Sequence, residues 1–386
     1  MKLIEKGLSY NPTNQQWISE YPVIGNLDTL PDNFSLANNL HTNLVRRLQK
    51  VNRLEDFDKE FKDAVDRGVF KVMKEKDWMY EGPVNYIAMT EAYKIGVNAT
   101  TPLRICMNSS LKKNGVCLND LLAKGPSALN CQMELLIRFR GHPMGMALDI
   151  KKFYNSVNSV ERDHHLRRVL WTAKPNEKPA VYLTAKVNFG DRPAGCVAGT
   201  ALAATADMFK EEDEVAAEKI KGDSYVDDII TGGESAEELS KLEISIASIC
   251  QKGGFALKPS VKTGDKADPL KILGVQWTPE SDELSIACKV NVSKKKKGIN
   301  EEEDLDLDTL LENLPPKLTR RIIWRVAMGN YDPIGLLCPI IIQLKYVMKS
   351  LSGDLHDKKD WDTAIDPEVA NKFKKAVMKL KEAKDI

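Results

Sequence analysis

The sequence predicts an α+β fold in which helices and strands surround one sheet. Around the segment SYVDDIITGGES the predicted order is strand, helix, strand, strand, helix, and KILGVQW adds a further strand near residues 271–277. A chain of 386 residues with 42% hydrophobic residues can bury a sizeable core and form two or three domains. The individual elements follow from the apolar spacing along the chain.

The N-terminal third is predicted to hold two amphipathic helices and two strands. Between about residues 35 and 75, leucines, phenylalanines and a valine recur near helical spacing: Leu40, Leu44, Leu48, Phe57, Phe61 and Val65. The segments GPVNYIAMTEAYKI and TPLRICMNSS are β-prone and bounded by Gly or Pro, which indicates strands.

The central part is predicted to alternate helices with short strands. SALNCQMELLIRFRGH is expected to form a helix leading into the strand MGMALDI, and residues 196–220 to form one alanine-rich, then acidic, helix. SAEELSKLEISIASICQKG is expected to be a third helix. After residue 280 the charged runs SKKKKG and EEEDLDLD predict a flexible linker, followed by a helical segment over about 317–351.

Composition excludes several classes of protein. Lys and Arg total 56 against 55 Asp and Glu, so any nucleic-acid site is expected to be a local patch. The seven scattered cysteines contain no CxxC pair, which indicates neither a disulfide framework nor a zinc knuckle. The N-terminus lacks a signal-peptide pattern and the longest apolar run, IGLLCPIII, is too short to span a bilayer, so an intracellular protein is expected. The motifs HExxH, GxxxxGK[ST] and GxSxG are absent.

Three aspartates are the strongest candidates for chemistry. Asp149 ends the strand MGMALDI, and Asp227 and Asp228 lie on the hairpin SYVDDII 78 residues later. A sheet that pairs these strands gathers three like charges, which must be protonated or bound to metal. Oxygen ligands suit Mg²⁺, and two such ions about 4 Å apart would clamp the attacking and leaving oxygens of a phosphoryl transfer. Most Asp-Asp pairs are solvated, but this pair interrupts an apolar, β-prone run.

Several ordered motifs resemble one family. YVDD on a hairpin, preceded by ALDIKKFYNSV, resembles the catalytic motifs of reverse transcriptases. PLRICMNSSLKKNGVCLNDLLAKGPSALN, LLIRFR, VNFGDRPAGC, KILGVQWTPESDEL and YDPIGLL resemble the Pao/BEL class of long-terminal-repeat retrotransposons. The resemblance extends over nearly the whole chain, from the opening KGLSYNPTNQQW onward.

The resemblance implies a right-hand polymerase with fingers, a ferredoxin-like palm and a helical thumb. The implied divisions are an N-terminal extension (1–39), fingers (40–124 and 158–185), palm (125–157 and 186–280), and linker with thumb (281–386). The implied reaction is RNA-directed DNA synthesis on an RNA or DNA template with a DNA primer, deoxynucleotides and two Mg²⁺ ions, or alternatively Mn²⁺. Because no Asp-Ser/Thr-Gly triplet occurs, protease is expected from a separate segment or protein, as are ribonuclease H and integrase.

Roles for individual residues are implied by the same resemblance. Asp149 and Asp227 would bind both metals with the backbone carbonyl of Ile150, and Asp228 would sit beside the primer terminus. Tyr154 occupies the position of an aromatic gate against a ribonucleotide 2′-hydroxyl, although an ordinary core tyrosine is the simpler interpretation.

Further residues are implied to contact the incoming nucleotide. Arg104 matches an arginine that folds over the triphosphate. Phe189 and Gly190 match the start of the segment beneath nucleotide and template. Lys258 and Lys262 are both candidates for the general acid that protonates pyrophosphate, with Lys262 preferred.

Two alternatives stay open at this point. The chain could be a catalytically idle, retroelement-derived protein that only binds nucleic acid, or a palm-fold nucleotidyltransferase or cyclase of another kind. The histidines His164 and His165 lack matching ligands at metal-binding spacing and are interpreted as structural or exposed. Location in a cytoplasmic retroelement particle or in the nucleus is left undecided.

Overall fold

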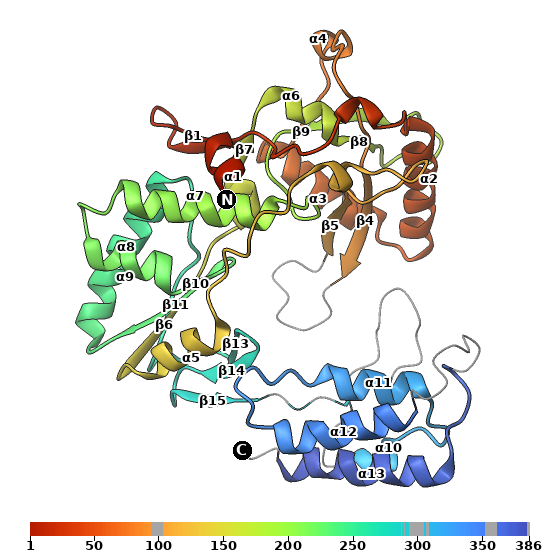
Figure 1. The fold of residues 1–386 in the computed structure, drawn as a ribbon, viewed down its shortest axis with the longest axis vertical. Coiled ribbons are helices and arrows are strands. Elements are labelled where there is room, and N and C mark those ends of the chain that lie inside the picture. The colour runs from red at the N-terminus through yellow and green to blue at the C-terminus, as the bar shows by residue number, and fades with distance from the viewer. Residues whose placement is uncertain are drawn as a thin grey trace. The chain divides into compact units, whose positions relative to one another are not determined.

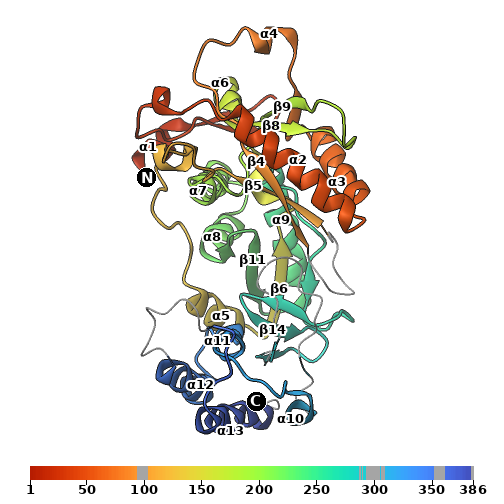
Figure 2. The same ribbon diagram turned by 90° about the vertical axis from the view of Figure 1, so that its right-hand side faces the viewer.

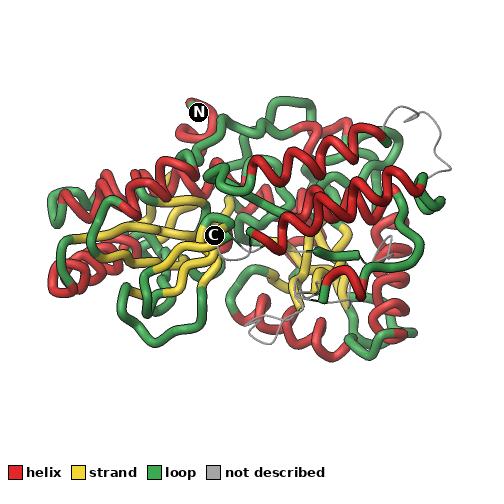
Figure 3. The backbone as a smooth tube through the Cα atoms, turned by 90° about the horizontal axis from the view of Figure 1, so that it is seen from below, coloured by secondary structure: helices red, strands yellow, loops and turns green. Residues whose placement is uncertain are grey.

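The computed structural model describes residues 1–93, 103–286, 288, 290–292, 305, 309–351 and 361–383, and the chain divides into two compact units. Unit 1 comprises Met1–Asn130 and Ala147–Ser260, and unit 2 comprises Cys131–Met146 and Val261–Ile386. Helices and strands mix throughout (Figure 3), which confirms the predicted mixed helical and sheet class. The segment SKKKKG, considered above as a linker, lies outside the described residues.

Unit 1 contains most of the strands. Its elements are α1 (Lys2–Gly7), β1 (Leu8–Asn11), β2 (Gln16–Ser19), η1 (Leu27–Thr29), α2 (Phe34–Lys50), α3 (Leu54–Asp66), β3 (Phe70–Val72), α4 (Glu75–Trp78), β4 (Ala88–Tyr93), β5 (Leu103–Asn108), η2 (Leu118–Leu121), the end of β6 (Met144–Asp149), η3 (Phe153–Ser156), β7 (Val157–Ser159), α6 (Glu161–His164), η4 (His165–Arg167), β8 (Arg168–Trp171), β9 (Ala180–Thr184), α7 (Ala194–Met208), α8 (Glu214–Gly222), β10 (Ser224–Tyr225), β11 (Asp228–Gly233) and α9 (Ala236–Lys252).

The two predicted amphipathic helices are α2 and α3, which pack against two antiparallel sheets. The helices contact β3, β4, β5 and β8, and Figure 2 shows them side by side along the β4–β5 hairpin. Leu44, Leu48, Phe57 and Phe61 are at most 1% exposed, as their helical spacing requires. Apolar periodicity therefore identified this layer correctly.

A second layer combines the hairpin β10–β11 with strand β6. Strand β11 lies between β10 and β6, while α8 and α9 contact β11 and α7 contacts both helices (Figure 1). The side-chain oxygens of Asp213 and Ser235 accept the Ala216 and Glu238 amides at 2.9 and 3.2 Å, which caps α8 and α9. The hairpin and the end of β6 thus rest on a helical support.

The N-terminal residues are integrated into this unit. Strand β2 pairs antiparallel with β1 and parallel with β7, with Trp17 opposite Val157. The Trp17 indole Nε1 donates to the Thr205 hydroxyl at 2.8 Å, which ties the segment to α7. Because β2 and β7 are far apart in the sequence, no short-range sequence pattern predicts that they pair in parallel.

Unit 2 contains a small sheet and a group of helices. Its elements are α5 (Gln132–Arg140), the first residues of β6, β12 (Val261–Lys262), β13 (Leu270–Ile272), β14 (Val275–Thr278), β15 (Glu283–Ser285), α10 (Leu310–Asn313), α11 (Arg320–Gly329), α12 (Cys338–Ser350) and α13 (Pro367–Glu382). Helix α12 contacts α11 and α13, and Ile322, Leu344 and Phe373 are fully buried in their shared core.

Three predicted elements differ in the structure, and each difference has a local cause. The single helix expected at 196–220 is two helices, α7 and α8, because Asp213 caps a new helix instead of continuing the first. The strand expected at 271–277 is the hairpin β13–β14, because Leu273 and Gly274 both have positive φ (45° and 96°) and reverse the chain. The helical segment expected at 317–351 is broken between α11 and α12, where the Asp332 carboxylate accepts the Leu336 and Leu337 amides.

The two adjacent histidines are structural and buried. His164 Nε2 lies 2.9 Å from the Ser159 carbonyl, and burial lowers the pKa of His164 to about 4. His165 stacks on Tyr80 with ring centroids 3.8 Å apart. Among the described residues, no helix combines the length and apolar character needed to cross a membrane.

The aromatic core of unit 1 provides a test of the packing. Phe61 is 1% exposed, stacks on Phe70 at 4.8 Å and contacts the ring of Trp171 at 5.5 Å. We expect Phe61→Ala to lower the free energy of unfolding by about 3–5 kcal/mol, because it removes a large buried ring and leaves a cavity. Urea titration followed by circular dichroism measures the change. Val72→Ala, at a side chain that is 52% exposed, is the control and should stay within about 0.5 kcal/mol of wild type. Equal stability of both variants would contradict the described core.

Candidate active site

Asp149 is the last residue of strand β6, which pairs with β11 of the YVDD hairpin. The Ile150 amide donates to the Asp227 carbonyl at 2.7 Å, which joins the strand directly to the hairpin turn. The Lys258 amide donates to the Asp149 carbonyl at 2.8 Å from the other side. Alternating burial along β6 covers Leu148 and Ile150 and leaves the Asp149 carboxylate 37% exposed.

The hairpin carries its two acids on a strained turn. Tyr225 pairs with Asp228 across the strands, so Val226 and Asp227 form the two-residue turn. Val226 has φ +57°, a left-handed conformation that is rare for a β-branched residue and costs on the order of 1–3 kcal/mol. Such strain persists only where surrounding contacts determine it, and it commonly accompanies functional turns.

Burial and mutual repulsion perturb the acids. Burial raises the pKa of Asp228 to about 7, with further upward contributions from the charges of Asp227 and Asp149. Burial also raises the pKa of Asp227, and Asp149 adds to the effect while Lys258 and Arg104 oppose it. The three acids therefore lie close enough to influence one another, as the predicted sheet pairing requires.

A pocket of about 890 Å³ in unit 1 collects most of the predicted residues. Its walls include predicted site residues from five separate segments: Arg104, Asp149, Ile150, Tyr154, Phe189, Asp227 and Lys258. Six basic and four acidic side chains line its described part, so the pocket has a local excess of positive charge although the whole chain is nearly neutral.

Tyr154 is positioned by a turn that follows Asp149. Lys152 has φ +50°, which redirects the chain into the short helix η3. Phe153 is buried against Phe255, with ring centroids 5.9 Å apart, while Tyr154 faces the pocket. Burial, followed by the charge of Asp227, raises the pKa of Tyr154, so its hydroxyl stays neutral near the carboxylates.

Arg104 and the turn at Phe189 form the opposite part of the pocket. Arg104 is exposed on β5, whose neighbouring side chains Leu103 and Ile105 are buried. Phe189 is 38% exposed. Gly190 has φ +106°, and a Cβ there would lie 2.2 Å from the Met107 carbonyl oxygen, so only glycine fits.

The two candidate lysines are placed differently. Lys258 lines the pocket, and its Nζ donates to the Asp149 carboxylate at 2.8 Å. Lys262 belongs to unit 2, on strand β12, where its backbone amide donates to Asp265 at 2.7 Å. The choice of Lys262 as general acid stays a prediction, and the pairing of Lys258 with Asp149 was not anticipated.

Asp149, Asp227 and the Ile150 carbonyl offer the type of ligand that Mg²⁺ prefers, namely carboxylate and carbonyl oxygens. Within the described residues, however, no three His, Cys, Asp or Glu side chains converge closely enough to hold a metal ion. Asp149 is instead engaged by Lys258. The metal therefore stays a prediction.

Sequence reasoning missed several cations of the pocket. Arg67, Lys152 and Lys186 line it, and Arg67 donates to Asp63 at 2.7 Å while Lys152 pairs with Glu60 at 3.1 Å. Burial lowers the pKa of Lys186, and the neighbouring Arg67 and Lys71 lower it further. No motif contains Arg67 or Lys186, and Lys152 lies in ALDIKKFYNSV without a role assigned to it, so only the tertiary structure places these cations at the pocket.

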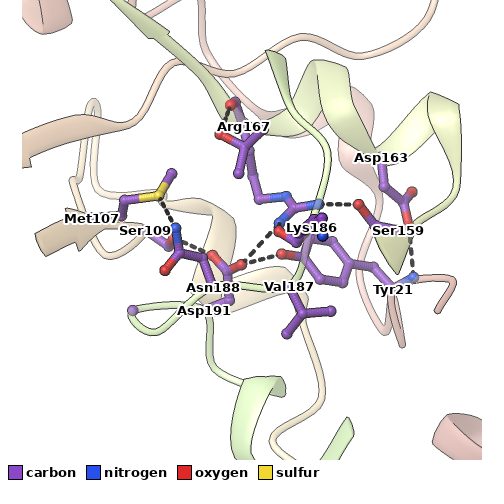
Figure 4. A network of polar contacts seen from close by, with 12 residues as sticks. Tyr21, Met107, Ser109, Ser159, Asp163, Arg167, Lys186, Val187, Asn188 and Asp191 are labelled. Atoms are coloured by element: carbon purple, nitrogen blue, oxygen red, sulfur yellow. Dashed lines mark hydrogen bonds and ion pairs between the residues drawn. The ribbon is translucent and has the colours of Figure 1, made fainter. Parts of the chain in front are cut away.

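A buried polar network beneath the Phe189 turn was also missed. Arg167 and Asp191 form an ion pair at 3.3 Å with both side chains fully buried, and the Tyr21 hydroxyl donates to Asp191 (Figure 4). GDRPAG marks Asp191 as part of a motif, but its partners lie 24 and 170 residues away.

One family model matches a C-terminal part of the chain. Residues 319–386 match a family model described as the Pao retrotransposon-like RNaseH-like domain. These residues fall within the segment predicted as linker and thumb, and the described part contains α11, α12 and α13. A sequence search of curated proteins finds no match.

Solved structures of a foamy viral protease-reverse transcriptase share the fold. Its complex with an RNA/DNA hybrid has a TM-score of 0.53 and 12% identity, covering 86% of this chain and 37% of that chain. The dRH form with ds DNA also has a TM-score of 0.53, with 13% identity over 83% of this chain and 46% of that chain. The complex with dsDNA again has a TM-score of 0.53, at 12% identity, with coverage of 85% and 56%. The chain thus spans about a third to just over half of these proteins.

The raised pKa of Asp228 predicts a pH-dependent stability. The folded pKa of about 7 exceeds the ordinary value of 3.8, so the folded state binds the proton more tightly and stability falls as pH rises from about 4 to 7. Asp228→Asn removes this loss, so in metal-free buffer its melting temperature should exceed that of wild type by several degrees at pH 8 and by less at pH 5. Thermal melts at both pH values measure this. Asp207→Asn, at an exposed acid, is the control; a pH-independent difference for Asp228→Asn would refute the assignment.

Proposed function

We propose that this chain is an RNA-directed DNA polymerase that extends a DNA primer on an RNA or DNA template. The observation that carries the proposal is the pocket that brings together Asp149, Tyr154, Asp227 and Arg104 from separate segments of the chain. The YVDD motif alone would be weak support. Carboxylates, an aromatic side chain and an arginine around one pocket are the groups that nucleotidyl transfer needs.

Each pocket residue has a role under this proposal. Asp149 and Asp227, with the Ile150 carbonyl, would hold two Mg²⁺ or Mn²⁺ ions, which would neutralise the triphosphate and activate the primer 3′-hydroxyl. Arg104 would bind phosphate oxygens of the deoxynucleotide, because its planar guanidinium presents paired donors. Lys258 would turn from Asp149 towards the departing pyrophosphate, or Lys262 would protonate it.

The nucleic-acid partner is proposed on electrostatic and structural grounds. The basic residues of the pocket, including Arg67, Lys152 and Lys186, suit a phosphate backbone even though the net charge of the chain is only +1. Proteins of the same fold bind RNA/DNA hybrid and dsDNA. A template-primer duplex gripped through its phosphates and its shape is the corresponding partner here.

A second function has one observation in its favour. The Lys258 ammonium pairs with Asp149 at 2.8 Å, so a cation of the protein already compensates this carboxylate. A catalytically idle nucleic-acid-binding protein would keep this pair permanently. A polymerase would break it when metal and nucleotide bind.

Asp227→Asn tests the polymerase proposal. The change removes one negative charge from the proposed metal site but keeps the side-chain volume, so primer extension should fall by roughly two orders of magnitude or more. Binding of a fluorescent RNA/DNA hybrid should stay close to wild type, because phosphate contacts supply most of that affinity. Extension is measured on an RNA template with a DNA primer, deoxynucleotides and Mg²⁺.

The matched control is Asp207→Asn, at an exposed aspartate on α7 that pairs with Lys221 at 2.7 Å. Its extension should equal that of wild type. Wild-type protein that binds the hybrid but never extends the primer would favour the idle nucleic-acid-binding protein.

Tyr154 tests the proposed sugar selectivity. Tyr154→Ala should reduce the preference for deoxynucleotides over ribonucleotides by about 10- to 200-fold, because the ring no longer blocks a 2′-hydroxyl. Tyr154→Phe keeps the ring and should keep the preference. Single-nucleotide incorporation kinetics with dNTP and rNTP measure both variants. Unchanged selectivity in Tyr154→Ala would make Tyr154 a core residue only.

A further inference from the structure

The turn that presents Phe189 to the pocket rests on a buried carboxylate. Asp191 is 5% exposed, and its oxygens accept hydrogen bonds from the Tyr21 hydroxyl and, at 2.5 Å, from the Ser109 hydroxyl. Arg167 Nη1 lies 3.3 Å from the same carboxylate. These donors come from the N-terminal segment, from the end of β5 and from η4 (Figure 4). One carboxylate thus joins three segments that are far apart in sequence.

Arg167 is itself fixed by further contacts. Its guanidinium donates to the Lys186 carbonyl at 2.6 Å and to the Ser159 hydroxyl at 2.5 Å, and it lies 4.6 Å from the centre of the Tyr21 ring. The Tyr21 amide donates to Asp163 at 2.7 Å. Because Tyr21, Arg167 and Asp191 are buried, moving Asp191 would leave buried donors unpaired.

The turn has additional bonds to β5, the strand that carries Arg104, and to the short helix η2. Asn188 Nδ2 lies 2.8 Å from the Met107 sulfur, and the Gly190 carbonyl accepts a hydrogen bond from Asn119 at 2.9 Å. Met107 and Ser109 lie three and five residues after Arg104, on β5 and just beyond its end. The network therefore determines how far Phe189 lies from Arg104, two residues that line the same pocket.

We propose that Asp191 is a positioning residue that sets the Phe189–Gly190 turn against the Arg104 strand, and that Tyr21 makes the N-terminal segment part of the nucleotide site. Asp191 and Tyr21 touch no substrate, since both are buried beneath the pocket. The proposal rests on the proposed polymerase function for its kinetic consequence. Its structural part, a turn held by the Tyr21 hydroxyl, stands independently of that function.

A purely stabilising role makes a different prediction. Loss of one buried hydrogen bond would then lower stability and leave the nucleotide affinity of the folded protein unchanged. A positioning role requires that the turn itself loosens while the rest of unit 1 stays ordered. The two roles differ in where amide exchange increases and in whether KM for the nucleotide rises.

Tyr21→Phe is the most informative variant, because it removes the hydroxyl and keeps the ring that packs on Arg167. Ser109→Ala removes the second donor to the same carboxylate. Asp191→Asn disrupts the buried ion pair and risks misfolding, so it is the third variant and not the first. Tyr10→Phe is the matched control, since its hydroxyl donates to the Lys252 carbonyl at 2.6 Å, away from the turn.

Hydrogen exchange of the substrate-free protein is measured first. Tyr21→Phe and Ser109→Ala should exchange faster in peptides that cover residues 188–192, with little change elsewhere, and Tyr10→Phe should leave those peptides unchanged. Unchanged exchange over 188–192, or an equal increase throughout unit 1, would overturn the proposal. This measurement uses no activity, so its failure is distinguishable from failure of the proposed polymerase function.

Single-nucleotide incorporation is measured second. With Tyr21→Phe, KM for the deoxynucleotide should rise about 3- to 10-fold while kcat stays within about twofold of wild type. Tyr10→Phe should change neither constant. An unchanged KM in both donor variants would also overturn the proposal and leave Asp191 as a stabilising residue.

Discussion

The buried ion pair between Arg167 and Asp191 is the constraint on which the Phe189 side of the pocket depends. Two charges with fully buried side chains carry a large desolvation cost, and hydrogen bonds from several surrounding groups are needed to offset it. Donors from Tyr21 and Ser109 and acceptors at Ser159 and Lys186 provide that bonding, so the N-terminal segment, the end of β5 and the Asn188–Asp191 turn must meet at one point. Among the described residues, Arg167 Nε has no partner, so the hydrogen bonding of the pair is incomplete at that atom.

The acidic side of the pocket is held together by main-chain hydrogen bonds and not by a buried ion pair. Main-chain pairing of β6 with the hairpin holds the carboxylates of Asp149, Asp227 and Asp228 together. Burial, followed by the neighbouring carboxylate charges, raises the pKa values of Asp227 and Asp228. Lys258 offsets part of the repulsion. Such an arrangement destabilises the fold, because like charges that are brought together repel one another. The surrounding lysines and arginines then favour a polyanion at the pocket.

Local signals in the sequence predicted the regular elements well where one physical effect dominated. Amphipathic spacing identified α2 and α3, and the segment SAEELSKLEISIASICQKG was correctly predicted as a helix, which is α9. The prediction was wrong where a short polar stretch both continued a helical pattern and capped a new helix, as at Asp213, and where Leu273 adopts positive φ in a turn. A leucine has no intrinsic preference for that conformation, so the hairpin β13–β14 depends on its context.

The sequence by itself determined the mixed class of the fold, the strand that ends at Asp149, and the hairpin that presents Asp227 and Asp228. These features depend on alternation, turn chemistry and backbone sterics, which act between neighbours in the chain. Only the tertiary structure decided that Lys258 pairs with Asp149, that Lys186 and Arg67 line the pocket, and that Tyr21 donates to Asp191. Those contacts join residues up to 170 positions apart. Their energies depend on burial and charge separation, which the order of residues does not specify until the chain has folded.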